Sequence, residues 1–427
     1  MFRTIIDAFK VKEIRKKILI TLLLLLVYRI GCWIPCVGFS TDAIFANSSG
    51  FGFFELMNMV SGGALQNCSV LALGVSPYIT ASIVIQLLTV AIPSLERLSK
   101  SGEDGRKKIS FYTRIAALVL AVAQAIGIVV SYSSSIDANL SGMPVWLVGC
   151  GVVLIMTAGA MFTVWIGERI TDLGIGNGTS LLIFVGILSS AGTSVSAIIE
   201  YCFVDITYIW YLVIFIVAVI AIFALIVFMD GGERRVQVQY AKQIKGRKMY
   251  GGQSNYIPIR INATGVMPII FATALITFPQ LIISIFWPDV TWYSDWLGTN
   301  SWLYIVLTSL LILVFAFFYS KISFNPDDVS KRIQQQGGFI PGIRAGKPTA
   351  EYLGKISNRV TLFGAIFLAV IALIPSLAFK AIGDYAGASI LINAFSATGL
   401  MIVVSTALEL EKQLSAQMYV RNHKGFL

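Results

Sequence analysis

The sequence predicts an all-α, polytopic membrane protein, and both composition and hydropathy patterning indicate this class. Of the 427 residues, 56% are hydrophobic and only 13% are charged, which is about half the charged fraction of a typical soluble protein. Apolar runs of about 20 residues, long enough to cross a hydrocarbon core of ~30 Å, recur along the chain. We therefore expect a bundle of transmembrane helices.

Ten such runs divide the chain into two halves of five. The predicted spans are residues 18–38, 70–92, 111–132, 145–167, 178–198, 208–229, 263–287, 302–321, 360–380 and 386–410. An odd number of spans in each half inserts the second half upside down, as in inverted-topology repeats. This symmetry is inferred from the span count alone. The expected divisions are a basic segment 1–17, an N-terminal half 18–200, a C-terminal half 201–410 and a tail 411–427.

The basic residues predict the orientation. The net charge is +10, and Lys and Arg are concentrated in alternate loops. The intervening loops at about 38–69, 134–143, 189–207 and 287–301 contain neither residue. The positive-inside rule then places both termini in the cytosol. Two long loops on the same side, 230–260 and 321–358, are basic, polar and without obvious secondary structure, and long loops of this kind are usually functional.

The stretch before the second span is broken and half polar. Gly62 and Gly63 are adjacent, and Gln66, Asn67 and Ser69 follow. Glycine pairs loosen a helix, and each unsatisfied backbone group in lipid costs roughly several kcal/mol. The pattern predicts a re-entrant or interfacial segment.

The spans lack the groups that ion-coupled transport and catalysis need. No acidic residue occupies the middle of a predicted span, whereas transporters bind or relay ions with such groups. Arg29 is expected to snorkel or to pair locally. The single His423 and the five cysteines, none in a CxxC pair, predict neither a catalytic constellation nor a metal or cofactor site. Uncoupled transport by a small-molecule secondary transporter with inverted repeats stays open, as does a disulfide among the cysteines.

Several long motifs resemble one known family. They are SGGAL followed by LALGVSPYITASIVIQLLTVAIPSL, then GRKKISFYTR, WIGERITDLGIGNGTSLLIFVGI, ERRVQVQYAK, GVMPIIFA and FNPDDVSKRIQQQGGFIPGIRAGKPTAEYL. In this order, over about residues 20–375, they strongly resemble the SecY family, the central subunits of the bacterial protein-translocation channel. The tenth span and the tail match only loosely. Cys36, in IPCVGF, stands where the family usually has glycine.

The resemblance implies a function and a location. Members of this family pass unfolded secretory polypeptides across the bacterial plasma membrane and release transmembrane segments sideways into lipid. They are not enzymes, and SecA or the translating ribosome drives them. The resemblance implies SecE and SecG as fellow subunits, with signal peptides and nascent chains as substrates and accessory membrane proteins as further partners.

It also implies an hourglass pore closed by a re-entrant plug helix. Residues 52–67, with Met57, Gly62 and Gly63, would be the plug. A narrow apolar waist would seal the pore, because narrow hydrophobic constrictions dewet. The spacing of four places Val75 with Ile79, and Ile183 with Ile187, on single helix faces. The resemblance adds Ile270 and Ile392 to the ring.

Two further groups of residues follow from the same resemblance. Gln86, Gln124 and Asn262 would help to hold shut a lateral gate between spans two and three on one side and seven and eight on the other. Simple helix–helix hydrogen bonding by these amides is an equal alternative. Arg247 and Lys248 in the first long loop, with Gly342 and Arg344 in the second, would dock SecA or the phosphate-rich ribosome.

Overall fold

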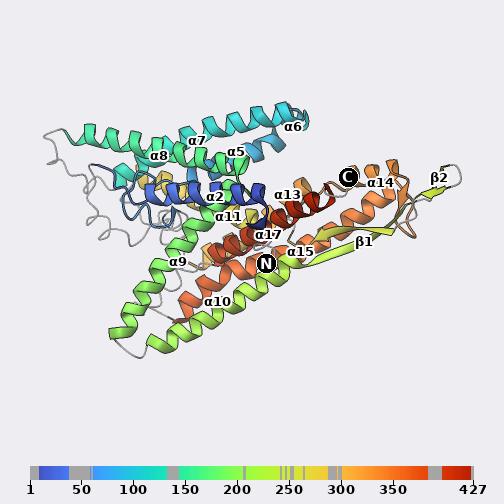
Figure 1. The fold of residues 1–427 in the computed structure, drawn as a ribbon. Coiled ribbons are helices and arrows are strands. Elements are labelled where there is room, and N and C mark those ends of the chain that lie inside the picture. The colour runs from blue at the N-terminus through green and yellow to red at the C-terminus, as the bar shows by residue number, and fades with distance from the viewer. Residues whose placement is uncertain are drawn as a thin grey trace.

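The computed structural model is dominated by long helices that run beside one another, with a small sheet projecting at one end (Figure 1). It describes residues 9–37, 58, 61–131, 144–204, 208–240, 243–245, 248–250, 254–262, 265–286, 296, 301–382 and 397–424.

The N-terminal half consists of helices on both sides of the broken segment. They are α2 (Lys12–Gly31), α5 (Ser76–Ala91), α6 (Pro93–Lys100), α7 (Glu103–Ser131), α8 (Val145–Leu173) and α9 (Gly178–Val204). Between α5 and α6 the chain bends by 107°, and Pro93, which opens α6, follows the extended residue Ile92. A proline at the first helical position starts a new helix without losing an internal hydrogen bond.

The C-terminal half has a second set of long helices. They are α10 (Tyr208–Gly231), α11 (Met267–Phe286), α13 (Trp302–Ser323), α14 (Pro326–Gln335), α15 (Lys347–Ile382) and α17 (Ala397–Lys424). Asn325 caps α14 by accepting a hydrogen bond from the backbone N–H of Asp327, and Asp327 and Asp328 complement the positive end of the helix dipole.

Every predicted span overlaps one of these long helices, although several helices begin or end at other residues than the predicted spans. The helix of the second span begins at Ser76 rather than at residue 70. The ninth begins at Lys347 rather than 360, and the tenth continues into the predicted tail, to Lys424. By length and apolarity alone, four of the described helices could cross a membrane, or five if α5 and α6 form one bent span. The count of ten spans stays a prediction.

The two long loops fold together, which the sequence had not led us to expect. Strands β4 (Ser254–Arg260), β1 (Glu233–Tyr240) and β5 (Gly338–Phe339) form an antiparallel sheet in that order, and β2 (Gln243–Lys245) pairs with β3 (Lys248–Tyr250). Val236 and Val238 alternate with exposed residues along β1 and pack with Ile333 of α14 and Leu353 of α15. The loops therefore form a small folded unit at the end of the bundle (Figure 1).

The broken segment, residues 61–75, lies inside the protein and is mostly turns. Residues Ser61, Ala64, Leu71 and Val75 are almost completely buried. The segment bonds back to the chain that follows α2, because Cys36 N–H donates to the Cys68 carbonyl (2.7 Å) and Val70 N–H to the Ile34 carbonyl (3.0 Å). Irregular backbone at membrane depth needs such protein partners.

A close approach to α8 fixes the position of this segment. A Cβ atom on Gly159 would lie 2.0 Å from the carbonyl oxygen of Val70, so only glycine fits there. The four cysteines whose side chains the structure describes, Cys32, Cys36, Cys68 and Cys150, are free thiols.

Replacing Gly159 with alanine should therefore destabilise the protein. We expect Gly159→Ala to lower the free energy of unfolding by about 1–3 kcal/mol, because the backbone of residue 70 must move. Thermal unfolding of the purified protein in detergent measures the loss as a fall in Tm. Gly151→Ala is the matched control, since it lies in the same helix with no atom within 4 Å of its added Cβ. Equal Tm values for the two variants would contradict this packing.

Candidate functional site

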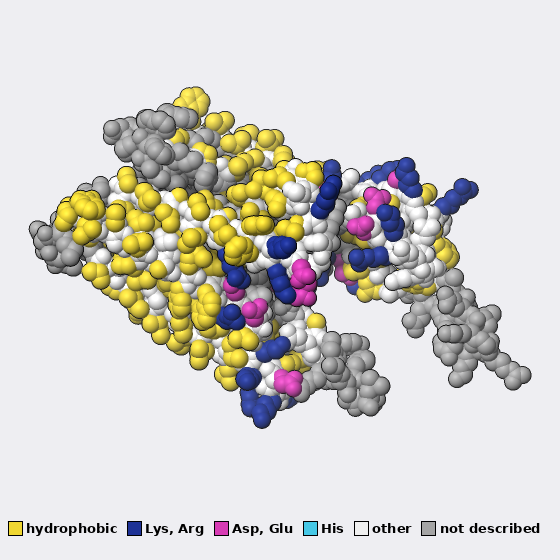
Figure 2. Space-filling view, turned by 90° about the horizontal axis from the view of Figure 1, so that it is seen from above, with side chains coloured by type: hydrophobic (Ala, Val, Ile, Leu, Met, Phe, Trp, Pro, Cys, Tyr) yellow, Lys and Arg dark blue, Asp and Glu magenta, His cyan; other side chains and the backbone are white. Residues whose placement is uncertain are grey.

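A cavity of about 1340 Å³ lies between the two halves of the chain. Helices α2, α5, α7, α8 and α9 contribute lining residues from the first half, and α10, α11 and α17 contribute them from the second. On the face seen in Figure 2, many hydrophobic side chains lie over one side of the molecule, whereas charged side chains gather toward the end that carries the sheet. The cavity is therefore lined by residues of both halves of the chain.

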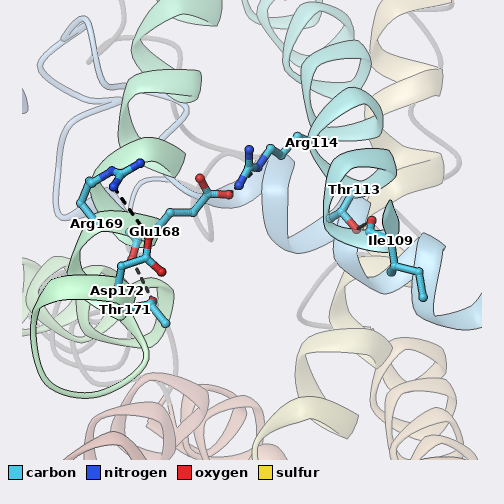
Figure 3. Close-up of polar contacts among 8 residues, drawn as sticks. Ile109, Thr113, Arg114, Glu168, Arg169, Thr171 and Asp172 are labelled. Carbon is cyan, nitrogen blue, oxygen red and sulfur yellow. Dashed lines mark hydrogen bonds and ion pairs between the residues drawn. The ribbon is translucent and has the colours of Figure 1, made fainter. Parts of the chain in front are cut away.

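The walls of the cavity are polar and electrically balanced. Four cationic side chains and four acidic side chains line it: Lys17, Arg114, Arg260, Lys412, Glu168, Asp172, Asp230 and Glu409. Arg114 of α7 and Glu168 of α8 point toward one another (Figure 3), and Arg114 Nε donates to Glu168 Oε1 over 2.6 Å. Both partners are partly exposed, so this pair adds little stability. The formal charges of the lining therefore cancel.

Apolar side chains close one end of the cavity. Along α17 the lining residues run from Ile402 through Ser405 and Glu409 to Lys412, so they become polar away from Ile402. Ile402 packs with Ile183 and Ile187 of α9, and all three are buried. Ile79, Val266, Ile270 and Val403 complete this cluster, which we call the apolar ring.

The structure brings four of the six predicted ring residues together: Ile79, Ile183, Ile187 and Ile270. Val75 lies outside the ring. It precedes the first residue of α5 and is buried in the neighbouring cluster around Tyr28 of α2, which Ile79 also contacts. Ile392 lies outside the described residues. Ile402 joins the ring instead, and sequence reasoning missed it because the motif match in the tenth span is loose.

Gln86 connects the two halves near the cavity. Tyr319 Oη of α13 donates to Gln86 Oε1 of α5 over 2.6 Å. The Tyr319 ring also packs against Phe271 of α11, with ring centroids 5.4 Å apart. Helix α11 contacts α7 as well. Helices α5 and α7 therefore meet α11 and α13 along one seam, which is the pair of helix sets predicted for the lateral gate.

The other two predicted gate amides lie elsewhere. Asn262 Nδ2 donates to Asp230 Oδ1 over 2.7 Å, so it connects the end of β4 to the end of α10 within the second half. Gln124 is 2% exposed, and its Oε1 has no hydrogen-bond partner among the described residues. It lies on α7 between Ala121 and Ala125, which belong to the core of the first half.

The predicted docking residues lie on the folded unit of the long loops. Arg344 is exposed in the turn before α15, and its carbonyl accepts a hydrogen bond from Thr349 Oγ1 (2.8 Å). Gly342 has φ of +81° in the same turn. Lys248 lies in β3, and Arg247 lies outside the described residues.

Another cation on this unit is held in place. Arg235 of β1 donates to Glu233 Oε1 (2.7 Å), and its guanidinium lies 4.8 Å from the centroid of the Tyr256 ring. The hydrogen bond to Glu233 raises the pKa of Arg235.

Of the predicted plug, residues 58 and 61–67 are described and Met57 is not. Gly62 and Gly63 both have positive φ, of +72° and +85°. Gly62 lies against Arg29 of α2 and the backbone of Gly186 of α9. Ser189, two residues beyond Ile187 of the apolar ring, lies on the same helix.

These features define a class of protein. The cavity has polar walls and is closed at one end by apolar residues from both halves, and the broken segment packs beside these residues. This is the arrangement of a closed membrane channel. The chain belongs to the SecY family, because the family model described as SecY matches residues 69–410.

Curated relatives extend this match over the full chain. The chain is 41% identical over 445 residues to "Protein translocase subunit SecY" of Streptomyces lividans, covering 100% of both sequences. It is 40% identical over 461 residues to the protein of the same name from Mycobacterium tuberculosis (strain ATCC 25618 / H37Rv), again covering 100% of both.

Solved structures show the same fold. "The structure of a protein conducting channel" aligns with a TM-score of 0.67 at 19% identity. "The plug domain of the SecY protein stablizes the closed state of the translocation channel and maintains a membrane seal" aligns with a TM-score of 0.65 at 18% identity. "Sec61 in the Canine ribosome-channel complex from the endoplasmic reticulum" aligns at 0.63 and 17%. Each covers 96% of this chain and 94% of the other.

Two cysteines introduced on α17 test whether water reaches the cavity walls but not the apolar ring. In a background with the five native cysteines replaced by alanine, Ala416→Cys lies on the cavity wall and Ile402→Cys in the ring. We expect a charged methanethiosulfonate to modify residue 416 roughly ten-fold faster or more, since thiol reactivity requires access. Equal modification rates would show that water reaches the apolar ring and would contradict a ring that excludes water.

Proposed function

We propose that this chain is the channel-forming subunit of a protein translocase, which passes unfolded polypeptides across a membrane and releases apolar segments sideways into lipid. The apolar ring at the end of the polar cavity is the observation that carries this proposal. An unfolded chain presents side chains of every kind, and balanced polar walls suit such a substrate better than a selective binding site would.

The size and location of the cavity support the same function. Pockets for small molecules usually measure about 300–1,000 Å³, whereas this cavity has about 1340 Å³ and draws residues from both halves. The ring consists of aliphatic side chains from α5, α9, α11 and α17. Such a ring can part around a translocating chain and can dewet when empty. The relatives are named translocase subunits, which favours the channel over a small-molecule transporter.

We assign residues 52–67 as the plug of the resting channel. Support comes from the described part of this element, because Gly62 packs on Gly186 of α9, between the ring residues Ile183 and Ile187. One structural neighbour is a SecY protein whose plug domain stabilises the closed state of its channel.

The seam between α5 and α13 is our candidate for the lateral gate, with Gln86 as the predicted residue that bridges it. Val75, Ile392, Gln124 and Asn262 keep their proposed pore and gate roles only as predictions. Interhelical hydrogen bonds in membranes are worth roughly 0.6–2 kcal/mol, so one such bond can bias a gate without locking it.

Removing the hydroxyl of Tyr319 should therefore make the gate easier to open. Tyr319→Phe keeps the packing on Phe271 and loses only the donor to Gln86. We expect weakly apolar segments to partition into lipid roughly three-fold more often or better, measured as the membrane-inserted fraction of a test segment. Tyr112→Phe, an exposed tyrosine on α7, is the control. No increase, or the same increase in both variants, would remove the seam as the gate.

The folded unit of the long loops is our candidate docking surface for SecA and for the ribosome. Its cations include Arg235, Lys248 and Arg344, and clusters of Lys and Arg bind phosphate-rich RNA electrostatically. One structural neighbour comes from a ribosome–channel complex. We further propose SecE and SecG as partner subunits and the bacterial plasma membrane as the location, with both termini cytosolic.

Reversing the charge of Arg344 should abolish driven transport without unfolding the protein. Arg344 is exposed, and like-charge contacts at an interface strongly weaken association, so we expect SecA-driven export of a secretory precursor into reconstituted vesicles to fall roughly ten-fold or more in Arg344→Glu. The Tm should stay within the small range typical of surface substitutions. Lys107→Glu, another exposed cation, serves as the control. Normal export by Arg344→Glu would refute the docking assignment.

A further inference from the structure

Arg29 joins three parts of the protein with one side chain. It lies near the end of α2 and is half-buried. Its Nη1 donates to the Gly62 carbonyl over 3.2 Å, and its Nη2 donates to the Ser189 hydroxyl of α9. The broken segment is thereby held between α2 and α9. We call these three groups the Arg29 latch.

The backbone at Gly62 is shaped to fit this side chain. A Cβ on Gly62 would lie 2.4 Å from Arg29 Nη1 and 2.9 Å from the Gly186 carbonyl oxygen. The neighbouring Gly63 has a similar positive φ, but an added Cβ would meet no atom within 4 Å. The two adjacent glycines therefore differ: both permit the turn, but only Gly62 makes room for Arg29.

The two hydrogen bonds of the Arg29 latch can hold the broken segment in place and can also break. Charge-assisted hydrogen bonds are roughly twice as strong as neutral ones, and the described part of the chain places no carboxylate in an ion pair with Arg29. The guanidinium depends on the two oxygens, since a cation left half-buried without partners is destabilised. The two hydrogen bonds of Arg29 are the contacts that tie the Gly62 end of the segment to α2 and α9 through this side chain.

The latch also lies next to the proposed seal. Along α9, Ile183 lines the cavity, Ile187 belongs to the apolar ring, and Ser189 follows. Gly62 packs against Gly186, which lies between the ring residues Ile183 and Ile187, so the latch lies against the same stretch of α9 as the ring. Movement of the segment away from α9 would remove support from behind the ring.

We propose that Arg29 is a positioning residue of the resting channel, which holds segment 61–75 against α9 through the Gly62 carbonyl and the Ser189 hydroxyl. This inference rests on the proposed channel function and adds to it the residue that keeps the broken segment in its closed position. Release of the latch would be one step of opening.

The test measures resting ion conductance of the full chain, reconstituted with its partner subunits in planar bilayers. We expect Arg29→Gln and Gly62→Ala each to raise it roughly ten-fold or more, because each removes charge-assisted hydrogen bonds from the closed state. Gly63→Ala is the matched control, since it carries the same backbone strain without the clash and should leak far less. Arg29→Lys should give an intermediate conductance, because one ammonium is a poor substitute for a forked donor.

A double variant separates the latch from general loosening. If Arg29 and Ser189 act through one contact, Arg29→Gln with Ser189→Ala should leak no more than Arg29→Gln alone. Additive leaks would overturn the latch. So would equal leaks from Gly62→Ala and Gly63→Ala. Export activity and Tm identify any variant that fails to fold, and Arg29→Lys and Ser189→Ala keep the test decisive in that case.

Deletion of residues 57–67 distinguishes failure of the latch from failure of the proposed function. If the deletion raises resting ion conductance and Arg29→Gln does not, the latch is refuted and the proposed channel function stands. If the wild-type protein exports no precursor and the deletion does not raise resting ion conductance, both the channel function and the latch are refuted.

Discussion

Backbone groups at membrane depth need hydrogen-bond partners from the protein, and segment 61–75 obtains them from every side. Arg29 reaches the Gly62 carbonyl, the chain after α2 bonds to residues 68 and 70, and Gly159 of α8 allows Val70 to approach. Because these backbone groups find partners within the protein, the segment can occupy the interior without being a helix. The helices of the first half are arranged around it.

The same arrangement positions the apolar ring. Helix α9 contributes Ile183 and Ile187 to the ring and, a short way along, Ser189 to the latch. Helices α11 and α17 bring Ile270 and Ile402 from the other half. The ring therefore draws its residues from both halves, which also meet at the seam of Gln86 and Tyr319.

Much of this could be predicted from the sequence, and the misses have physical causes. The apolar runs predicted the helices because a helix satisfies its own backbone groups in lipid, but hydropathy does not mark helix ends. Helix α5 begins later than the predicted span because residues 70–75 form turns, and α15 begins earlier, at Lys347. Four ring isoleucines lie in long motifs and were found. Ile402 was missed because a single isoleucine in an apolar helix carries no signal of its own. The sheet was missed although Val236 and Val238 alternate with polar residues along β1, since both long loops were read as lacking secondary structure and β5 comes from the second of them.

The central claim is that the substrate passes through the apolar ring, and site-specific photocrosslinking tests it directly. A secretory chain carrying a photoreactive probe would be stalled during SecA-driven transport into vesicles that contain this protein and SecE. We predict crosslinks to Ile79, Ile183 and Ile270, and none to Leu154, which is 71% exposed on the outer face of α8. Efficient transport without contact to the three isoleucines would contradict the account.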